Sequence, residues 1–188
     1  IIDLNKTISK LEEACRSLKQ IAKSGKKILF VATKKQAKSI VAESAKSLNM
    51  PYITERWPGG LLTNFSTIRK SIKKMNSIDT MKEDGTFDTL SKREKLQIER
   101  TREKLELNFG SIENMNRIPE AIFVVDINKE HIAVAEANKL GMRSYAMVDT
   151  NTNPKLVNFP IPANDDSTKS ISKIMQIISE AIAEGLSE

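Results

Sequence analysis

Two continuous apolar runs, at residues 27–33 and 119–126, constrain the fold of this chain most strongly. Neither run alternates with polar residues, which is the pattern of a strand buried on both faces of a sheet. Shorter extended runs predict further strands at residues 1–4, 51–54, 144–149 and 158–163. Apolar residues at helical spacing predict helices at residues 5–23, 34–48 and 129–140, and a last helix that starts at Asp165-Asp166-Ser167. This alternation predicts a three-layer α/β domain with a parallel sheet, and the two prolines of the last strand place it at an edge.

The alternation is interrupted between residues 64 and 118. Two helices are predicted there, at 64–82 and 91–107, with a turn between them. The second helix is very polar and is expected to lie outside the core; its apolar residues are Leu96, Ile98, Leu105 and Leu107. The pattern predicts a projecting antiparallel helical hairpin, inserted into an α/β domain made of residues 1–63 and 119–188. Because the chain opens on a strand-like segment without an initiator methionine, we expect an N-terminal segment to be missing.

Composition indicates a polyanion-facing side. The net charge is +6, divided as +7 in residues 1–50, +3 in 51–118 and −4 in 119–188. Such an asymmetry is typical of a protein with one face toward a polyanion, although a lysine-rich solvated surface has the same composition. No apolar run approaches the roughly 20 residues of a membrane span. The single Cys15 excludes an intramolecular disulfide and indicates a reducing compartment.

The sequence carries no enzyme signature. A phosphate loop, a dinucleotide-binding glycine motif and a nucleophile elbow are all missing. His131 is the only histidine and is interpreted as a surface or structural residue, and Cys15 as a small core residue. Asp126 and Asp149 end strands at the carboxyl edge and are interpreted as loop-shaping. We therefore predict no catalytic residue, no metal site and no cofactor.

Cationic side chains on the predicted hairpin favour nucleic-acid binding. On the first helix, Arg69 and Lys73, like Lys70 and Lys74, are four residues apart and share a flank that can face backbone phosphates. The second helix extends this surface with Lys92, Arg93, Lys95, Arg100, Arg102 and Lys104. Aromatic residues make up only 5% of the chain, so we expect recognition through the backbone and shape of an RNA rather than through base stacking.

Four motifs, in order along the chain, resemble the bacterial small-subunit ribosomal protein S-two (S2) family. The first is Arg56-Trp57-Pro58-Gly59-Gly60-Leu61-Leu62-Thr63-Asn64-Phe65 with the following Thr67-Ile68-Arg69. The others are the block at 119–141, the segment 148–151 with Pro154, and Ile161-Pro162-Ala163-Asn164-Asp165-Asp166. Ile2-Asp3-Leu4 is similar to the early strand of the family. The resemblance spans nearly the whole chain.

This resemblance implies a flavodoxin-like domain with a protruding, coiled-coil-like helical hairpin. It implies a structural, non-enzymatic role in the cytoplasm: binding small-subunit ribosomal RNA and neighbouring ribosomal proteins, and helping to dock ribosomal protein S-one (S1) for mRNA recruitment. Within the matched block, Arg56, Asn64 and Arg69 are expected to contact RNA or orient the turn. Trp57, Gly59 and Gly60 are expected to form a structural hinge that fixes the hairpin to the sheet. The alternatives are a non-ribosomal RNA- or protein-binding α/β module and, behind it, a small-ligand enzyme.

Overall fold

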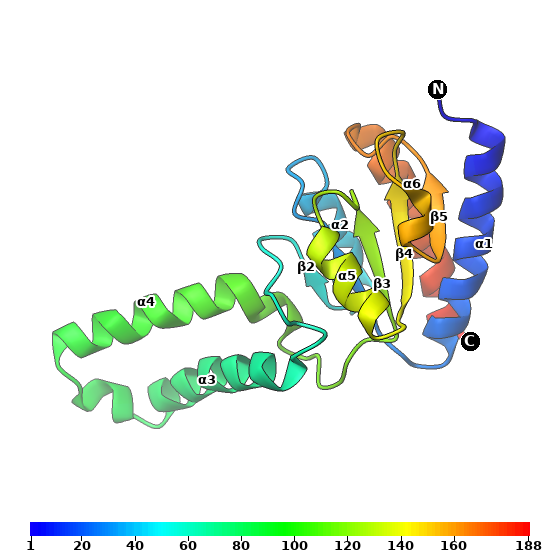
Figure 1. Cartoon of the computed structure of the whole chain (residues 1–188). Coiled ribbons are helices and arrows are strands. Elements are labelled where there is room, and N and C mark those ends of the chain that lie inside the picture. The colour runs from blue at the N-terminus through cyan, green and yellow to red at the C-terminus, as the bar shows by residue number, and fades with distance from the viewer.

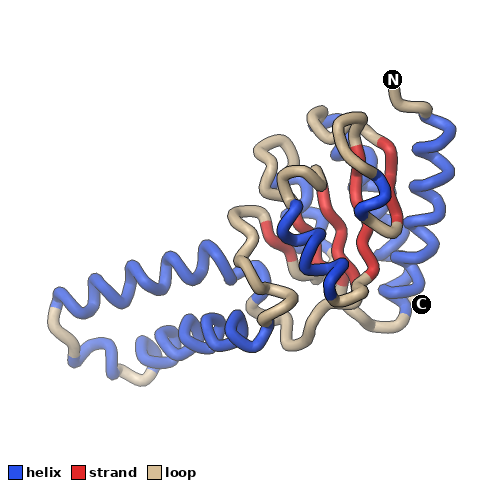
Figure 2. Tube along the Cα trace, in the orientation of Figure 1, coloured by secondary structure: helices blue, strands red, loops and turns tan.

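A computed structural model describes the whole chain, residues 1–188, and contains a five-stranded parallel sheet flanked by helices (Figures 1 and 2). The strands are β1 (Ile28–Val31), β2 (Tyr52–Ile53), β3 (Ala121–Val125), β4 (Arg143–Val148) and β5 (Phe159–Pro162). Their order in the sheet is β2-β1-β3-β4-β5, which is the order of flavodoxin-like sheets. The predicted α/β class and parallel sheet are confirmed, and proline-containing β5 lies at an edge.

The helices cover both faces of the sheet and create two apolar cores. They are α1 (Leu4–Lys23), α2 (Lys38–Ser47), α3 (Phe65–Glu83), α4 (Lys92–Phe109), α5 (His131–Lys139) and α6 (Thr168–Ser187). One core joins α1, α2 and α6 to alternate strand residues such as Phe30 and Phe123. The other joins α5, the first turns of α3 and the loop before it to the opposite strand face, including Leu29 and Ile122. None of these helices has an apolar stretch long enough to cross a membrane.

Two sequence-based boundaries are wrong. Residues 1–4 were predicted as a strand, but the chain enters α1 at Leu4 and no strand precedes it. Asp3 is the cause: its carboxylate accepts a hydrogen bond from the backbone N–H of Asn5 at 2.9 Å and caps the helix. The second predicted helix begins at Lys38 rather than at Lys34, because the chain first makes a turn that directs the Lys34 side chain toward the sheet edge.

Helices α3 and α4 lie side by side and extend away from the sheet (Figure 1). Met75 and Ile78 of α3 are buried, whereas α4 has no buried residue, as its composition predicts. A capping box formed by Ser91 and Glu94 starts α4. The two helices are joined by Arg102 of α4, whose Nε and Nη2 donate to the two carboxylate oxygens of Asp79 on α3 at 2.7 and 3.1 Å. We refer to α3 and α4 together as the helical pair.

Candidate nucleic-acid interface

The loop that leads from β2 into α3 is held by one buried carboxylate. Glu136 of α5 is 8% exposed, and its Oε2 accepts hydrogen bonds from Trp57 Nε1 at 2.6 Å and from the N–H of Gly60 at 3.2 Å. Its Oε1 accepts from the N–H of Leu62 at 3.2 Å, and from the N–H and hydroxyl of Thr63 at 3.1 and 2.9 Å. This Glu136 cluster therefore joins the loop before α3 to α5.

Five hydrogen bonds to one carboxylate keep Glu136 ionised. Burial alone would raise the pKa of Glu136, but the donors of Trp57, Thr63 and Gly60 outweigh it, and the pKa is lowered. Gly60 has a left-handed backbone, with φ of 85°, and a Cβ there would lie 3.1 Å from Cβ of Asn64. Gly59 has neither feature. Of the residues predicted to form the structural hinge, Trp57 and Gly60 thus have a local geometric reason, and Gly59 has none.

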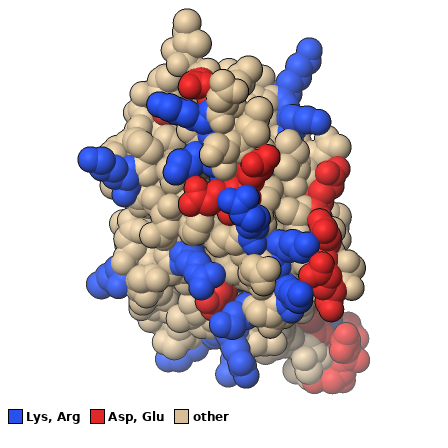
Figure 3. Space-filling model, turned by 90° about the vertical axis from the view of Figure 1, so that its right-hand side faces the viewer, with Lys and Arg blue, Asp and Glu red and all other residues tan.

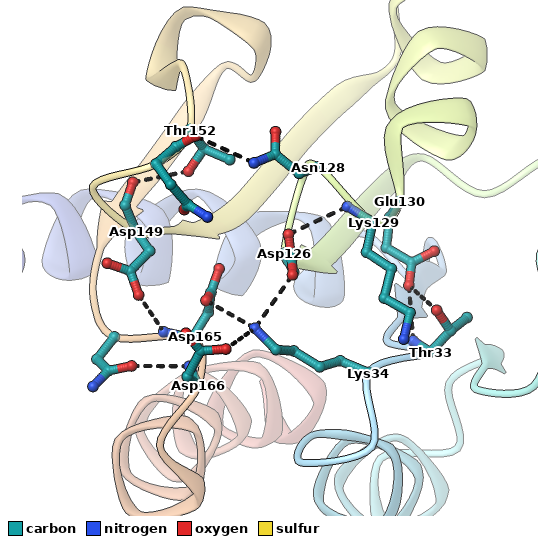
Figure 4. A network of polar contacts seen from close by, with 12 residues as sticks. Thr33, Lys34, Asp126, Asn128, Lys129, Glu130, Asp149, Thr152, Asp165 and Asp166 are labelled. Atoms are coloured by element: carbon teal, nitrogen blue, oxygen red, sulfur yellow. Dashed lines mark hydrogen bonds and ion pairs between the residues drawn. The ribbon is translucent and has the colours of Figure 1, made fainter.

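A second polar network lies at the carboxyl ends of the strands (Figure 4). Lys34 Nζ lies 3.2 Å from Asp126, 3.0 Å from Asp165 and 2.5 Å from Asp166. Burial disfavours the charged form of Lys34, but these carboxylates more than compensate, and the pKa of Lys34 is raised. Burial also raises the pKa of Asp165, which is 2% exposed, against the opposing effect of Lys34. The network joins the turn after β1 to the start of α6.

The two strand-end aspartates have the loop-shaping contacts that their positions suggested. Asp126 Oδ1 accepts from the N–H of Lys129, and Asp149 accepts from the N–H groups of Thr150 and Asp165. Asp149, Asp165 and Asp166 offer oxygens within 4.8 Å of one another, a donor set that suits a hard cation, and the ammonium of Lys34 supplies positive charge to two of the three.

Cys15 and His131, the two residues considered as possible catalytic groups, have no contacts that would activate them. Cys15 is half-buried against the core under α1, and burial together with the charge of Glu12 raises its pKa to about 11. A thiol with that pKa is protonated at neutral pH and is a poor nucleophile. His131 is exposed at the start of α5, and its Nδ1 lies 3.1 Å from the carbonyl oxygen of Asn128.

The predicted RNA-contacting residues of the first helix differ in their availability. Lys70, Lys73 and Lys74 are exposed on α3, and none has a carboxylate within 4.0 Å. Arg69 is half-buried, and its Nη1 donates to the carbonyl oxygens of Glu113 and Met115 at 3.4 and 3.2 Å. Arg69 therefore joins α3 to the chain that returns from α4, and the three lysines are the free cations of this helix.

The residues at the entry to α3 are also exposed. Arg56 lies in the loop after β2 and has no ion-pair partner. Asn64 precedes α3, but its side chain does not cap the backbone; its Oδ1 accepts from the hydroxyl of Thr67 at 3.0 Å instead.

On α4, five of the predicted cations are unpaired and one is not. Those without an ion-pair partner are Lys92, Arg93, Lys95, Arg100 and Lys104. Lys95 lies 5.7 Å from the ring centroid of Phe87 at the far end of the helical pair. Arg102 is engaged with Asp79 and, at 3.0 Å, with Glu106. The structure thus uses Arg102 to hold the helical pair together.

The opposite end of the molecule has a different charge pattern. Figure 3 shows the face that carries α1, where basic and acidic side chains are interspersed. Lys19 pairs with Glu184 at 3.0 Å and with Glu188 at 3.2 Å, and Lys23 pairs with Glu188 at 3.1 Å. On α1, three of the five cations thus have a carboxylate partner and Lys6 and Arg16 do not, whereas on the helical pair Arg102 alone is paired.

Sequence reasoning identified the cations but missed two buried carboxylates that hold loops in place. Glu136 and Glu130 were treated only as parts of a matched block, yet both are buried. Glu130 accepts from the N–H of Thr33 at 2.8 Å and thereby fixes the loop after β1. A signal was present: Glu136 lies three residues after Ala133 and next to Ala137, on the side of a short helix that is buried, where a carboxylate requires donors.

The chain matches known proteins over nearly its whole length. The family model described as Ribosomal protein S2 matches residues 1–185. The small ribosomal subunit protein uS2 of Flavobacterium johnsoniae is 64% identical over 188 residues, which is 100% of this chain and 74% of the relative. The uS2 proteins of Flavobacterium psychrophilum and Porphyromonas gingivalis are 65% and 63% identical, over 99% and 100% of this chain and 70% and 67% of the relatives.

Proposed function

Because this chain belongs to the ribosomal protein S2 family, we propose that it binds small-subunit ribosomal RNA through the helical pair. Proteins of this family are structural, non-enzymatic components of the small ribosomal subunit. The observation that carries the proposal is the set of unpaired cations on α3 and α4. Cations without carboxylate partners remain available to neutralise phosphates, and each such contact adds affinity through the release of counterions.

The helical pair is suited to this role by its exposure. Residues 64–118 leave the sheet after β2 and return before β3, so we propose that they form an inserted, coiled-coil-like arm on the flavodoxin-like domain of residues 1–63 and 119–188. Lys70 and Lys74 share one flank of α3, and Lys73 follows Arg69 on the adjacent one. Lys92, Arg93, Lys95 and Arg100 extend the charged surface along α4. The proposed contact is to RNA backbone, because the arm carries few aromatic side chains.

The Glu136 cluster supports the proposal by setting the direction of the arm. Trp57 and Gly60 are bound to Glu136 on α5, directly before α3 begins. Arg56 and Asn64 lie on either side of this cluster and are exposed. We propose that these two residues contact RNA next to the arm, while Trp57, Gly60 and Glu136 hold the arm in a fixed orientation to the sheet.

We also propose, from the family resemblance, that the chain takes part in docking ribosomal protein S1. The first turns of α1 provide a surface distant from the arm: Leu4 and Ile8 are 73% and 55% exposed. Exposed apolar residues of this size favour a protein contact over an RNA contact. Substituting both by serine is expected to weaken binding to purified S1 without weakening binding to RNA.

Sedimentation tests the proposed assembly. In a gradient of cell extract at physiological salt, the chain is expected to migrate with the small subunit. Crosslinks formed within assembled subunits are expected to join ribosomal RNA to the segments 69–74 and 92–100. Migration with the subunit combined with crosslinks only to the α1 face would contradict RNA binding by the arm.

A further inference from the structure

A groove lies where the chain returns from α4 to the sheet. It consists of two adjoining clefts, with volumes of about 440 and 400 Å³, that share Lys27, Asn114 and Met115. Lys46, at the end of α2, lies in one cleft, and Arg117, before β3, lies in the other. We call this the basal groove. None of its cations was among the residues singled out from the sequence.

The basal groove carries unpaired positive charge. Lys27, Lys46 and Arg117 are exposed and belong to no ion pair. Lys27 Nζ donates to the carbonyl oxygen of Asn49 at 2.9 Å, which fixes its direction and leaves two of its three N–H groups free. Lys46 Nζ lies 5.8 Å from the ring centroid of Tyr52, which orients it over the aromatic face. Two cations of the groove are therefore held in place without being neutralised.

The carboxylates along the groove do not offset these cations. Glu120 is paired with Lys26 at 3.3 Å, so this pair adds no net charge. Glu113 remains as the one acidic lining residue without a partner, against three unpaired cations. The net charge of the groove is positive.

We propose that the basal groove binds the sugar–phosphate backbone of RNA, as a contact site additional to the cations of the helical pair. The inference rests on the proposed function and names a further site for the same ligand. The exposed amides of Asn114 and Asn116 have no hydrogen-bond partner within the chain and supply donors and acceptors for phosphate oxygens and the 2′-hydroxyl. The groove presents no free aromatic face, which favours backbone over base contacts.

The lining of the groove argues against a protein partner. Its apolar members Met50, Ile112 and Met115 are 4%, 1% and 4% exposed, and Tyr52 is half-buried beside Lys46. Only Ile118, at one end, offers exposed apolar surface. A protein interface of standard size relies on a buried apolar or aromatic centre, and the groove has none to contribute.

The groove is continuous with the proposed arm contact. Arg69 on the first turns of α3 donates to the carbonyl oxygens of Glu113 and Met115, which belong to the wall of the groove. These two hydrogen bonds fix the segment that carries Asn114 next to α3, the helix that carries Lys70. A single RNA segment that crosses the base of the arm can therefore contact both sets of cations.

The test compares two triple variants with the same change in charge. Replacing Lys27, Lys46 and Arg117 by glutamine is expected to lower the slope of log Kobs against log salt by about two to three, since each phosphate contact contributes about 0.7–0.9. The control replaces Lys155, Lys169 and Lys173, which are also exposed and unpaired, and is expected to leave the slope within about 0.5 of the original. The probe is a transcript of small-subunit ribosomal RNA. Equal losses in both variants, or none in the first, would overturn the inference.

Three single variants keep the inference testable if the first triple variant is unstable. Lys46→Gln and Arg117→Gln, each alone, are expected to lower the slope by about one, and Asn114→Asp is expected to weaken RNA binding by repulsion of phosphate. Hydroxyl-radical footprinting separates this site from the arm: the groove variant is expected to lose one protected RNA segment and to retain the others. If the unaltered chain binds no RNA, the proposed function fails; if it binds and only arm variants weaken it, this inference alone fails.

Discussion

Residues 64–118 and the remainder of the chain carry the same net charge but use it differently. The first region has 12 basic and 9 acidic side chains, and the second has 18 and 15, so each is +3. In the sheet region, lysines 10, 19, 23, 26, 34 and 38 are paired with carboxylates. In the helical pair, Arg102 is the only paired cation. The other 12 cations of the sheet region are unpaired as well, so binding depends on where unpaired cations gather and not on net charge.

The two regions also differ in what stabilises them. The sheet region has two apolar cores and two buried ionic clusters, around Lys34 and Glu136, that join loops to neighbouring helices. The helical pair has a single apolar stripe on α3 and an α4 without buried residues. Substitutions within the two buried clusters are consequently expected to destabilise the first region, whereas substitutions of exposed cations on the helical pair are expected to change binding.

The largest expected effect is that of Lys34→Met. This change leaves the buried Asp165 and its neighbours without a counter-ion, and we expect the free energy of unfolding to fall by about 3–5 kcal/mol in urea titrations at neutral pH. Lys38→Met is the control, because the Lys38–Glu55 pair is exposed and is expected to contribute about 0–1 kcal/mol. Equal losses in the two variants would remove the distinction between buried and surface pairs.

Glu136→Gln is expected to lower the free energy of unfolding by about 1–3 kcal/mol, since the amide cannot accept from all five donors. The pKa of Glu136 is lowered in the folded state, so its stabilisation is complete above the ordinary pKa of glutamate and is lost as the pH falls through the lower folded value. The difference between the chain and the variant should therefore shrink in acid. Glu43→Gln, at an exposed position of α2, is the control and is expected to change the free energy of unfolding by less than about 0.5 kcal/mol.

The Glu136 cluster also shows where sequence-based prediction of this fold ends. Strands β1 and β3 could be predicted because their apolar runs are buried on both faces, and α6 because its isoleucines recur at helical spacing. The partner of Trp57 could not, because Glu136 lies 79 residues away and is brought to it only by the sheet. The cations of the helical pair can be identified from the sequence. Whether each of them is paired depends on distant carboxylates, such as Asp79 for Arg102.

The adjacent Gly59 and Gly60, in the loop that connects the two regions, are expected to respond differently to substitution. Gly60→Ala is expected to cost about 1–2 kcal/mol, because it forces a left-handed backbone on alanine and brings its Cβ to 3.1 Å from Asn64. Gly59→Ala is expected to change the free energy of unfolding by less than about 0.5 kcal/mol, since its Cβ would meet open space. Similar effects for both would mean that the loop before α3 does not depend on the left-handed conformation of Gly60.

Apart from the control variants, the smallest expected effect on stability is that of Arg102→Ala. The pair with Asp79 is partly exposed, so we expect a loss of about 0.2–1 kcal/mol, observed as a small shift in the unfolding midpoint. Hydrogen exchange should nevertheless increase in α4, because this residue is its main polar link to α3. A change confined to the sheet region would contradict this role.

The salt dependence of RNA binding tests the central distinction between paired and unpaired cations most directly. Lysines 70, 73 and 74 are unpaired on α3, and lysines 10, 19 and 23 are paired on α1, so replacing either set by glutamine removes the same charge. We expect the α3 variant to lower the slope of log Kobs against log salt by about two to three, and the α1 variant to leave it within about 0.5. Equal slopes for the two variants would contradict the assignment of RNA binding to the arm.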